Sequence, residues 1–294
     1  MEQGVICKGI GGFYYVRMDA DGRTVECKAR GRFRREGIKP TVGDRVQVNI
    51  GDDGKGYLDA ILPRKNHIIR PAIANVDRAF VVITPCNPEP NLLLIDKILA
   101  ICAVKDIEAF VVINKTDLDE GEDLAAIYEK AGYPVIRASA ITGRGMEDIR
   151  AAMRGHISFF SGSSGIGKSS MINQLVPGIC MEVGDISKKI SRGRHTTRHV
   201  ELFPLEGGGY LADTPGFSSF DIEKLDVIKK DQLIFGFPDI LKYSDGCRFT
   251  GCSHTCEKGC RVLEAVAAGD ISSSRHESYV KLYEQLKNIK EWEQ

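Results

Sequence analysis

The chain has 294 residues, of which 43% are hydrophobic and 27% are charged, and its 40 Lys and Arg balance 40 Asp and Glu. This composition excludes a disordered or low-complexity chain and supplies enough apolar side chains for a packed core. The length predicts about two domains and allows three small ones. No run approaches the roughly 18 apolar residues of a membrane span, and no secretory signal pattern begins the sequence. We therefore expect a cytoplasmic protein with no membrane partner.

The distribution of charge and the number of cysteines each indicate a kind of partner or site. Residues 1–70 hold fourteen Lys and Arg against nine Asp and Glu, and this surplus predicts an anionic partner for the N-terminal part. Nine cysteines in a reducing compartment argue against a disulfide framework, so a tight cysteine cluster is better interpreted as a metal site.

The N-terminal part shows short β-type runs separated by Asp and Gly turns. These runs predict five strands, at residues 4–8, 13–18, 24–29, 45–50 and 57–62. Five short strands within about sixty residues favour a small closed barrel of the oligonucleotide-binding type. The barrel pattern ends at a predicted linker, residues 64–75, which is bracketed by Pro63 and Pro71.

A basic segment runs from the end of the third strand into the next loop, with Phe33 among its charges. Its basic residues are Lys28, Arg30, Arg32, Arg34, Arg35 and Lys39. The segment either contacts a nucleic-acid backbone or is a solvated surface with incidental positive charge. Both interpretations remain open from the sequence.

From Ala79 onward, apolar runs alternate with helical patterns. The runs predict strands at 79–84, 109–114, 134–138 and 157–160, and the helices are expected at 92–104, 123–131 and 146–153. Continuous apolar strands are typical of a parallel sheet covered on both faces. The alternation therefore predicts a doubly wound α/β domain.

A phosphate-binding loop follows the last of these strands. The segment fits G-x-x-x-x-G-K-[ST] at every fixed position and comprises Gly162, Ser163, Ser164, Gly165, Ile166, Gly167, Lys168, Ser169 and Ser170. Glycines let backbone N–H groups surround a triphosphate, and the following helix adds the positive end of its dipole. Lys168 would reach the β and γ phosphates, and Ser169 would ligate Mg²⁺. The alternative is an ordinary Gly/Ser turn between a strand and a helix.

Two polar segments at strand ends predict guanine recognition: Asn114-Lys115-Thr116-Asp117 and Ser139-Ala140. A carboxylate can accept hydrogen bonds from N1–H and the 2-amino group of guanine, whereas a buried Asp117 would be left unpaired against adenine. Lys115 can lie along the base, and Asn114 can tie loops together. The alternative is a polar helix start, since Asn and Asp are common caps.

These segments precede the phosphate loop in the chain. GTPases usually have the opposite order, and a parallel sheet with neighbouring termini can be cut and rejoined without changing its core. We therefore expect the same site with different covalent attachments.

The segment after the loop predicts a γ-phosphate switch. A hairpin at 200–204 and 210–213 ends in Asp213, a carboxylate expected on the metal side, and the N–H of Gly216 can approach the γ-phosphate. Thr197, or alternatively Thr196, could close on Mg²⁺ only when that phosphate is present. His195 either positions the attacking water or contacts RNA or nothing.

The C-terminal part contains five potential metal ligands within fourteen residues: Cys247, Cys252, His254, Cys256 and Cys260. Tetrahedral Zn²⁺ needs four thiolate or imidazole ligands. Reduced cysteines without metal are the alternative, and no four-cysteine ferredoxin spacing indicates an iron–sulfur cluster.

With these motifs in hand, the chain closely resembles the ribosome small-subunit-dependent GTPase A family, which are circularly permuted GTPases of bacteria. The resemblance covers essentially the full length: the barrel, NKTD and SA before GSSGIGKSS, then GRHTT, DTPG and C-x4-C-x-H-x5-C. It assigns zinc to Cys247, Cys252, His254 and Cys260, and the extra Cys256 departs from the family pattern. It also implies the replacement of the usual water-orienting Gln by a hydrophobic residue, here Phe217.

The resemblance implies three domains: an oligonucleotide-binding barrel that binds RNA (1–68), a circularly permuted α/β GTPase domain (69–221) and a mainly helical zinc-binding domain (222–294). It implies a factor in late maturation of the small ribosomal subunit that binds the subunit and its 16S rRNA. We expect Mg²⁺-dependent GTP hydrolysis that the subunit stimulates and that releases late assembly factors or the protein itself, which we expect to be a monomer. Two alternatives are an RNA-binding module with incidental turnover and an ATP-driven enzyme, the latter disfavoured by residues 114–117.

Overall fold

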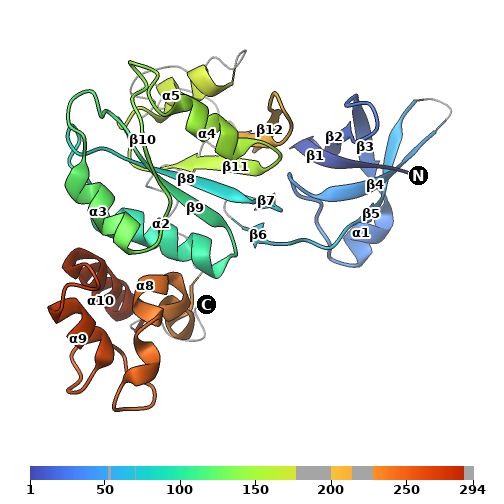
Figure 1. The fold of residues 1–294 in the computed structure, drawn as a ribbon. Helices are drawn as coiled ribbons and strands as arrows, with labels where there is room; N and C mark the ends of the chain where they lie inside the picture. The colour runs from blue at the N-terminus through green and yellow to red at the C-terminus, as the bar shows by residue number, and fades with distance from the viewer. Residues whose placement is uncertain (52–53, 70, 177–199, 214–227, 288–294) are drawn as a thin grey trace, which may run out of the picture. The chain divides into compact units, whose positions relative to one another are not determined.

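A computed structural model describes residues 1–51, 54–69, 71–176, 200–213 and 228–287 (Figure 1). The chain forms two compact units. The first contains the described residues of 1–78, 153–159 and 191–217, and the second contains those of 79–152, 160–190 and 218–294. The C-terminal helices therefore belong to the same unit as most of the α/β domain.

The N-terminal strands form a closed barrel, which confirms the predicted fold of this part. Its strands are β1 (Glu2–Ile10), β2 (Phe13–Met18), β3 (Thr24–Ala29), β4 (Arg45–Ile50) and β5 (Gly56–Ile61). They pair in the order β1-β2-β3-β5-β4, and β4 pairs back onto β1 to close the ring. Alternating residues fill the interior, among them Val16, Cys27 and Leu58, whose exposed fractions are all 0%. The period-2 pattern of each strand thus builds the barrel core.

The basic segment is only partly a free loop. It forms a short helix, α1 (Gly31–Arg35), and Phe33 points into the core with 4% of its surface exposed. The guanidinium groups of Arg30 and Arg32 lie 3.0 and 3.7 Å from the carboxylate of Asp59. Phe33 is therefore unavailable to stack on a base, and two of the predicted positive charges already have an acidic neighbour in the barrel.

The predicted linker is instead an ordered hairpin, β6 (His67–Ile68) and β7 (Ile73–Ala74). Arg64 binds the buried carboxylate of Asp44 through two hydrogen bonds of 2.6 and 2.8 Å. Ile73 is fully buried and bridges to Val42 of the barrel. The expectation of a linker is wrong here because the prolines end the barrel strand while distant partners order the segment that follows.

The second unit contains the expected parallel strands and their helices. The strands are β8 (Arg78–Ile83), β9 (Glu108–Ile113), β10 (Val135–Arg137) and the end of β11 (Ile157–Ser161), and the helices are α2 (Leu92–Val104), α3 (Glu122–Lys130), α4 (Met146–Met153) and α5 (Lys168–Leu175). Helices α2 and α3 lie on one side of β8–β10, and α4 and α5 lie on the other (Figure 1). The rings of Phe110, Phe80 and Phe160 stack in a row, with centroids 5.2 and 5.1 Å apart. The predicted doubly wound α/β layer is confirmed.

A second hairpin belongs to the first unit. Strands β12 (Glu201–Pro204) and β13 (Tyr210–Asp213) pair antiparallel, as the sequence predicts. Strand β12 pairs with β1, where the ammonium of Lys8 lies 2.6 Å from the carboxylate of Glu201. Strand β13 runs parallel to β11, with Ile157 opposite Tyr210. Asp213 therefore ends the strand that runs beside β11.

The described C-terminal residues form helices, and the first and the last of these helices pack against α2. They are η1 (Lys230–Gly236), α8 (Pro238–Leu241), η2 (Ser244–Gly246), α9 (Arg261–Ala267) and α10 (Ser273–Lys287). One buried cluster joins Ala100 of α2 to Phe237, Cys260 and Tyr279. A Cβ added at Gly236 would lie 2.7 Å from that of Ala100, so only glycine allows this close approach. The C-terminal part and α2 consequently share a core.

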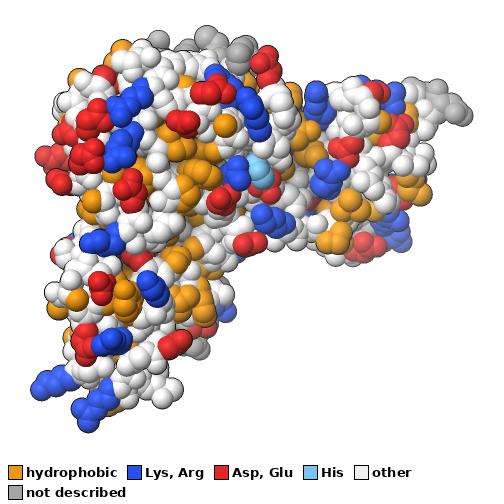
Figure 2. All heavy atoms as spheres, in the orientation of Figure 1, with side chains coloured by type: hydrophobic (Ala, Val, Ile, Leu, Met, Phe, Trp, Pro, Cys, Tyr) orange, Lys and Arg blue, Asp and Glu red, His pale blue; other side chains and the backbone are white. Residues whose placement is uncertain are grey.

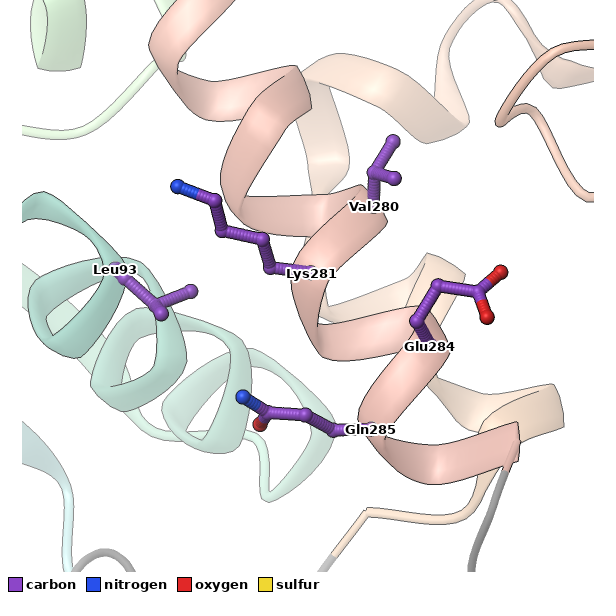
Figure 3. Close-up of a pocket in the computed structure, with 5 residues that line it drawn as sticks. All are labelled: Leu93, Val280, Lys281, Glu284 and Gln285. Atoms are coloured by element: carbon purple, nitrogen blue, oxygen red, sulfur yellow. The ribbon is translucent and has the colours of Figure 1, made fainter.

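The described residues line a surface pocket next to α2. A pocket of about 370 Å³ lies between α2 and α10, lined by Leu93, Val280, Lys281, Glu284 and Gln285 (Figure 3). None of these is a predicted site residue. On the face drawn in Figure 2, acidic and basic side chains are interspersed. In the same part of the chain, no helix has the length and apolarity that a bilayer crossing requires.

Candidate functional site

The phosphate loop joins the buried strand β11 to α5, which begins at Lys168. Gly162 and Gly167 have φ angles of 138° and 91°, in the left-handed region. A Cβ at Gly162 would lie 2.3 Å from the carbonyl oxygen of Val82, and one at Gly167 would lie 2.4 Å from Nδ2 of Asn114. Both glycines are therefore required by close contacts as well as by backbone conformation. These contacts restrict the backbone of the loop to this shape.

Lys168 folds back onto this loop. Its Nζ donates to the carbonyl oxygens of Gly162 and Ser163 at 2.7 and 2.5 Å. Burial lowers the pKa of Lys168 to about 8, because a charged ammonium loses solvation there. An anion placed in the loop would replace that lost solvation. The site is consequently electrostatically suited to phosphate.

Asn114 joins the guanine-recognition segments to the phosphate loop. Its Nδ2 donates to the carbonyl oxygen of Ile166 at 2.7 Å, and its Oδ1 accepts from the backbone N–H of Ala140 at 3.1 Å. Asn114 is 1% exposed, so these bonds form in a largely dry environment. Three segments that are far apart in sequence thus meet at one side chain.

Asp117 is held by Ser139, which is fully buried. Ser139 Oγ donates to Oδ1 of Asp117 at 2.5 Å and accepts from the N–H groups of Ile141 and Thr142 at 3.3 and 3.2 Å. Asp117 is exposed, not buried as the argument against adenine assumed.

Lys115 and Thr116 occupy distinct positions beside Asp117. Lys115 has a left-handed backbone with φ 66°, and its ammonium donates to the carbonyl oxygen of Asn87. Thr116 is buried, and its hydroxyl donates to the carbonyl oxygen of Ala138 at 2.9 Å. Thr116 therefore attaches the segment to the residue that follows β10, and Lys115 extends to the loop that follows β8.

Some of the other predicted site residues lie within the described part of the chain, and others lie outside it. Ser169 and Ser170 lie in the first turn of α5 and are half-buried, and the backbone of Asp213 ends β13. His195, Thr196, Thr197, Gly216 and Phe217 lie outside the described residues. The switch assignments remain predictions.

Four C-terminal side chains form a candidate metal centre: Cys247, Cys252, His254 and Cys260. Their ligand atoms all lie within 4.8 Å of one another. Cys247 Sγ is 3.8 Å from Cys260 Sγ, and Nδ1 of His254 is 3.4 and 3.6 Å from these two sulfurs. Tetrahedral Zn²⁺ with ordinary bond lengths implies about 3.8 Å between sulfurs and about 3.5 Å between sulfur and nitrogen. The donor set therefore fits zinc in both chemistry and spacing.

Cys256 does not belong to this group and is exposed. Glu257, which sequence analysis did not single out, organises the loop instead. Its carboxylate accepts from the N–H groups of Ser253, Thr255 and Cys256 at 2.7, 3.0 and 3.1 Å. Burial raises the pKa of Glu257, but these bonds outweigh it and lower the pKa to about 2. The only signal in the sequence was an acidic residue among small polar ones between the ligands.

Family models and named relatives match this chain over most of its length. The RsgA GTPase family model matches residues 61–223, and the RsgA N-terminal domain model matches residues 3–58. Proteins named small ribosomal subunit biogenesis GTPase RsgA from Ruminiclostridium cellulolyticum and Caldanaerobacter subterraneus are 44% and 43% identical to this chain. The alignments cover 99% and 97% of this chain and 96% of each relative.

Two solved structures are similar to this chain over nearly its full length. YjeQ from Thermotoga maritima has a TM-score of 0.84 at 34% identity, with 98% of this chain and 99% of that chain covered. YloQ, described as a circularly permuted GTPase, has a TM-score of 0.81 at 35% identity, with 99% and 96% covered. The predicted permuted fold and its GTP-hydrolysing class are thereby confirmed. The chain belongs to the RsgA GTPase family.

Proposed function

We propose that this GTPase binds the small ribosomal subunit and acts late in its maturation, with GTP hydrolysis that the subunit stimulates. The names of the relatives support the subunit as partner. The observation that carries the proposal is the 2.7 Å bond from Asn114 to Ile166, because it joins base recognition to the phosphate loop. Hydrolysis would release late assembly factors or the protein itself. The protein would act as a monomer in the cytoplasm, where subunits assemble.

The phosphate side of the site supplies charge stabilisation. The loop amides and Lys168 would hold the β and γ phosphates, and Lys168 would exchange its bonds to loop carbonyls for phosphate oxygens. Because the chain offers positive groups at fixed positions, little reorganisation is needed as charge develops in the transition state. Asp117, held by Ser139, would select guanine.

The metal side is assigned to three residues. Ser169 and Thr197 would ligate Mg²⁺, and Asp213 would anchor it from the end of β13. The ion, when bound with GTP, neutralises phosphate charge. Gly216 would contact the γ-phosphate, so that residues near 185–200 respond to its loss. The C-terminal site would hold one structural zinc ion per chain.

Slow turnover by the free protein follows from Phe217, which cannot orient water by a hydrogen bond. Even a glutamine-containing GTPase such as Ras hydrolyses GTP at only about 10⁻⁴ s⁻¹ unaided, and a partner adds roughly 10³ to 10⁵-fold. His195 is our candidate for positioning water when the subunit is bound. A His195→Ala protein that keeps full subunit-stimulated turnover would exclude this role.

We assign three domains, the barrel at 1–68, the GTPase domain at 69–221 and the zinc-binding domain at 222–294. The barrel is the domain that would contact RNA. Lys28, Arg35 and Lys39 stay exposed in the basic segment, and Lys28 lies over the ring of Phe13 at 5.0 Å. Exposed positive groups beside aromatic rings suit a nucleic-acid strand.

The deciding experiment is GTP turnover with and without purified small subunits. The proposal expects turnover to rise by at least about 100-fold at saturating subunit, within the range that partners supply to such enzymes. Equal slow turnover in both conditions would instead indicate an RNA-binding module with incidental hydrolysis. Large ribosomal subunits serve as the control for non-specific RNA effects.

A further inference from the structure

His254, one of the four candidate zinc ligands, has an unusual backbone conformation. Its φ angle is 59°, in the left-handed region that residues with a Cβ rarely adopt. The residue is buried, and its Nδ1 lies 3.4 and 3.6 Å from the sulfurs of Cys247 and Cys260. Because Nδ1 is the ring nitrogen nearer to the backbone, its position follows any movement of the main chain closely. The ligand geometry therefore depends on contacts that hold this backbone.

Glu257 holds the main chain on both sides of His254. Its Oε1 accepts from the N–H of Ser253 at 2.7 Å and also from the hydroxyl of that residue. Its Oε2 accepts from the N–H groups of Thr255 and Cys256 at 3.0 and 3.1 Å. In a glutamine, one of these two oxygens would become an NH₂ group that faces backbone donors. A carboxylate at this position thus satisfies donors that an amide cannot.

His276 of α10 holds the same ligand residue from a different element. Its Nε2 donates to the carbonyl oxygen of His254 at 2.7 Å, and both residues are buried, so water competes little for this bond. The ring of His276 stacks with that of Tyr279, with centroids 6.5 Å apart. The preceding residue, Arg275, binds Asp96 of α2. The carbonyl of His254 is therefore held by a helix that is itself fastened in the core.

We propose that Glu257 and His276 are positioning residues for the zinc centre, which clamp the backbone of His254 and thereby set how tightly the chain holds the ion. The cluster of four ligand atoms includes neither side chain. Without the clamp, His254 would relax from the left-handed conformation when no ion is bound, and zinc binding would have to restore it. Affinity would then fall while the ligand set stayed the same. This inference rests on the assignment of zinc under the proposed function.

The first test measures zinc dissociation constants of the full chain by competition with a chromogenic chelator. Glu257→Gln should weaken zinc binding about 10- to 100-fold, the usual effect of removing a group that orients a metal ligand. Glu264→Gln is the matched control, because it also replaces a carboxylate by an amide, at an exposed position on α9 that pairs with Arg261 at 2.7 Å. The control should leave the zinc dissociation constant unchanged.

Two substitutions of His276 separate its hydrogen bond from the packing of its ring. His276→Phe keeps an aromatic ring beside Tyr279 and removes the donor, so it should weaken zinc binding about tenfold. His276→Gln keeps an N–H group at a similar distance from the backbone, and its zinc dissociation constant should lie closer to that of the unmodified protein. Equal losses in the two variants would overturn the role of the hydrogen bond to His254.

Cobalt substitution reports the ligand set directly, because the visible absorption of Co²⁺ depends on the number of thiolates that bind it. Glu257→Gln and His276→Phe should keep the spectrum of the unmodified protein. An altered spectrum would overturn the inference, since a ligand would then have been lost. Unchanged zinc affinity in these variants would also overturn it. Absence of zinc binding by the unmodified protein would instead refute the metal assignment, and the clamp with it.

Discussion

We propose Asp117 as the residue on which base selection depends. Its Oδ1 is held by Ser139 at 2.5 Å, and an amide at this position would present a donor where the guanine 2-amino group also donates. Asp117→Asn should weaken GTP at least about 100-fold and shift the preference toward xanthosine nucleotides, which present an acceptor there. Steady-state turnover with GTP and XTP measures this shift.

Asp119→Asn is the matched control for that substitution. Asp119 is also exposed, two residues away, and accepts a hydrogen bond from the N–H of Gly121 at 2.8 Å. It should keep the preference for GTP. If Asp117→Asn used GTP as well as the unmodified protein does, the assignment of base recognition would be wrong.

Lys168 predicts a pH dependence of nucleotide affinity. Its pKa is about 8 in the free site because of burial, and bound phosphates should raise it by stabilising the ammonium. Binding above pH 8 then requires uptake of a proton, so affinity falls as pH rises. Between pH 7 and 8.5 the dissociation constant of GDP should increase roughly fourfold.

Lys168→Arg provides the control for this titration, because a guanidinium stays protonated over the whole range. Its affinity can be lower overall, but its pH profile between 7 and 8.5 should be flat. Isothermal calorimetry in buffers of different ionisation enthalpy would also detect the proton uptake. A flat profile for the unmodified protein would contradict the account of Lys168.

At the scale of elements, a buried charge cluster fastens the C-terminal part to α2. Arg275 of α10 is fully buried and donates to Asp96 of α2 at 2.8 Å and to Asp239 of α8 at 2.8 and 3.1 Å. Its guanidinium also lies 4.5 Å from the ring centroid of Phe237. Burial raises the pKa of Asp96, and the charge of Arg275 opposes this rise. The cluster therefore depends on all three charges.

Arg275→Met should lower the free energy of unfolding by about 3–5 kcal/mol, because two carboxylates would be left buried without a counter-charge. Replacing Arg275, Asp96 and Asp239 together by apolar residues of similar size should lower the free energy of unfolding much less. Urea denaturation followed by circular dichroism measures both. A loss below about 1 kcal/mol for Arg275→Met would show that the cluster is not structurally important.

The metal centre gives a second prediction at this scale. Cys252→Ser should remove zinc, because it takes away one of four clustered ligands, while Cys256→Ser should keep about one ion per chain. Since Cys260 also belongs to the core shared with α2, loss of zinc should lower the urea midpoint of the protein. Elemental analysis and denaturation of both variants provide the measurement. Zinc loss from Cys256→Ser would mean that the ligand set is wrong.

At the scale of the molecule, the sequence predicted the elements whose patterns are local. Barrel strands such as 13–18 and helices such as 92–104 coincide with β2 and α2, because alternation and apolar spacing are set within each element. The phosphate loop was predictable because its residue types are dictated by the anion that it surrounds. The structure brings together Cys247, Cys252, His254 and Cys260, the set that the resemblance implied, whereas ligand chemistry alone left Cys256 as a fifth candidate.

What the sequence did not predict depends on partners far away in the chain. The hairpin β6–β7 forms because Arg64 reaches Asp44 and Ile73 reaches Val42. Phe33 is buried although its neighbours in the sequence are basic. Arg275 and Asp96 are 179 residues apart, and the sequence around either one does not identify the other as its partner. Such pairings are decided by tertiary packing and not by local propensity.

The central claim is that two segments exchanged in chain order form one guanine nucleotide site, joined by Asn114. Competition of GDP and ADP for a bound fluorescent GDP derivative tests it most directly. We predict that GDP competes at concentrations about 10⁴-fold lower than ADP, the discrimination expected when a polar site is left unpaired by the wrong base. Equal competition by ADP would contradict the claim.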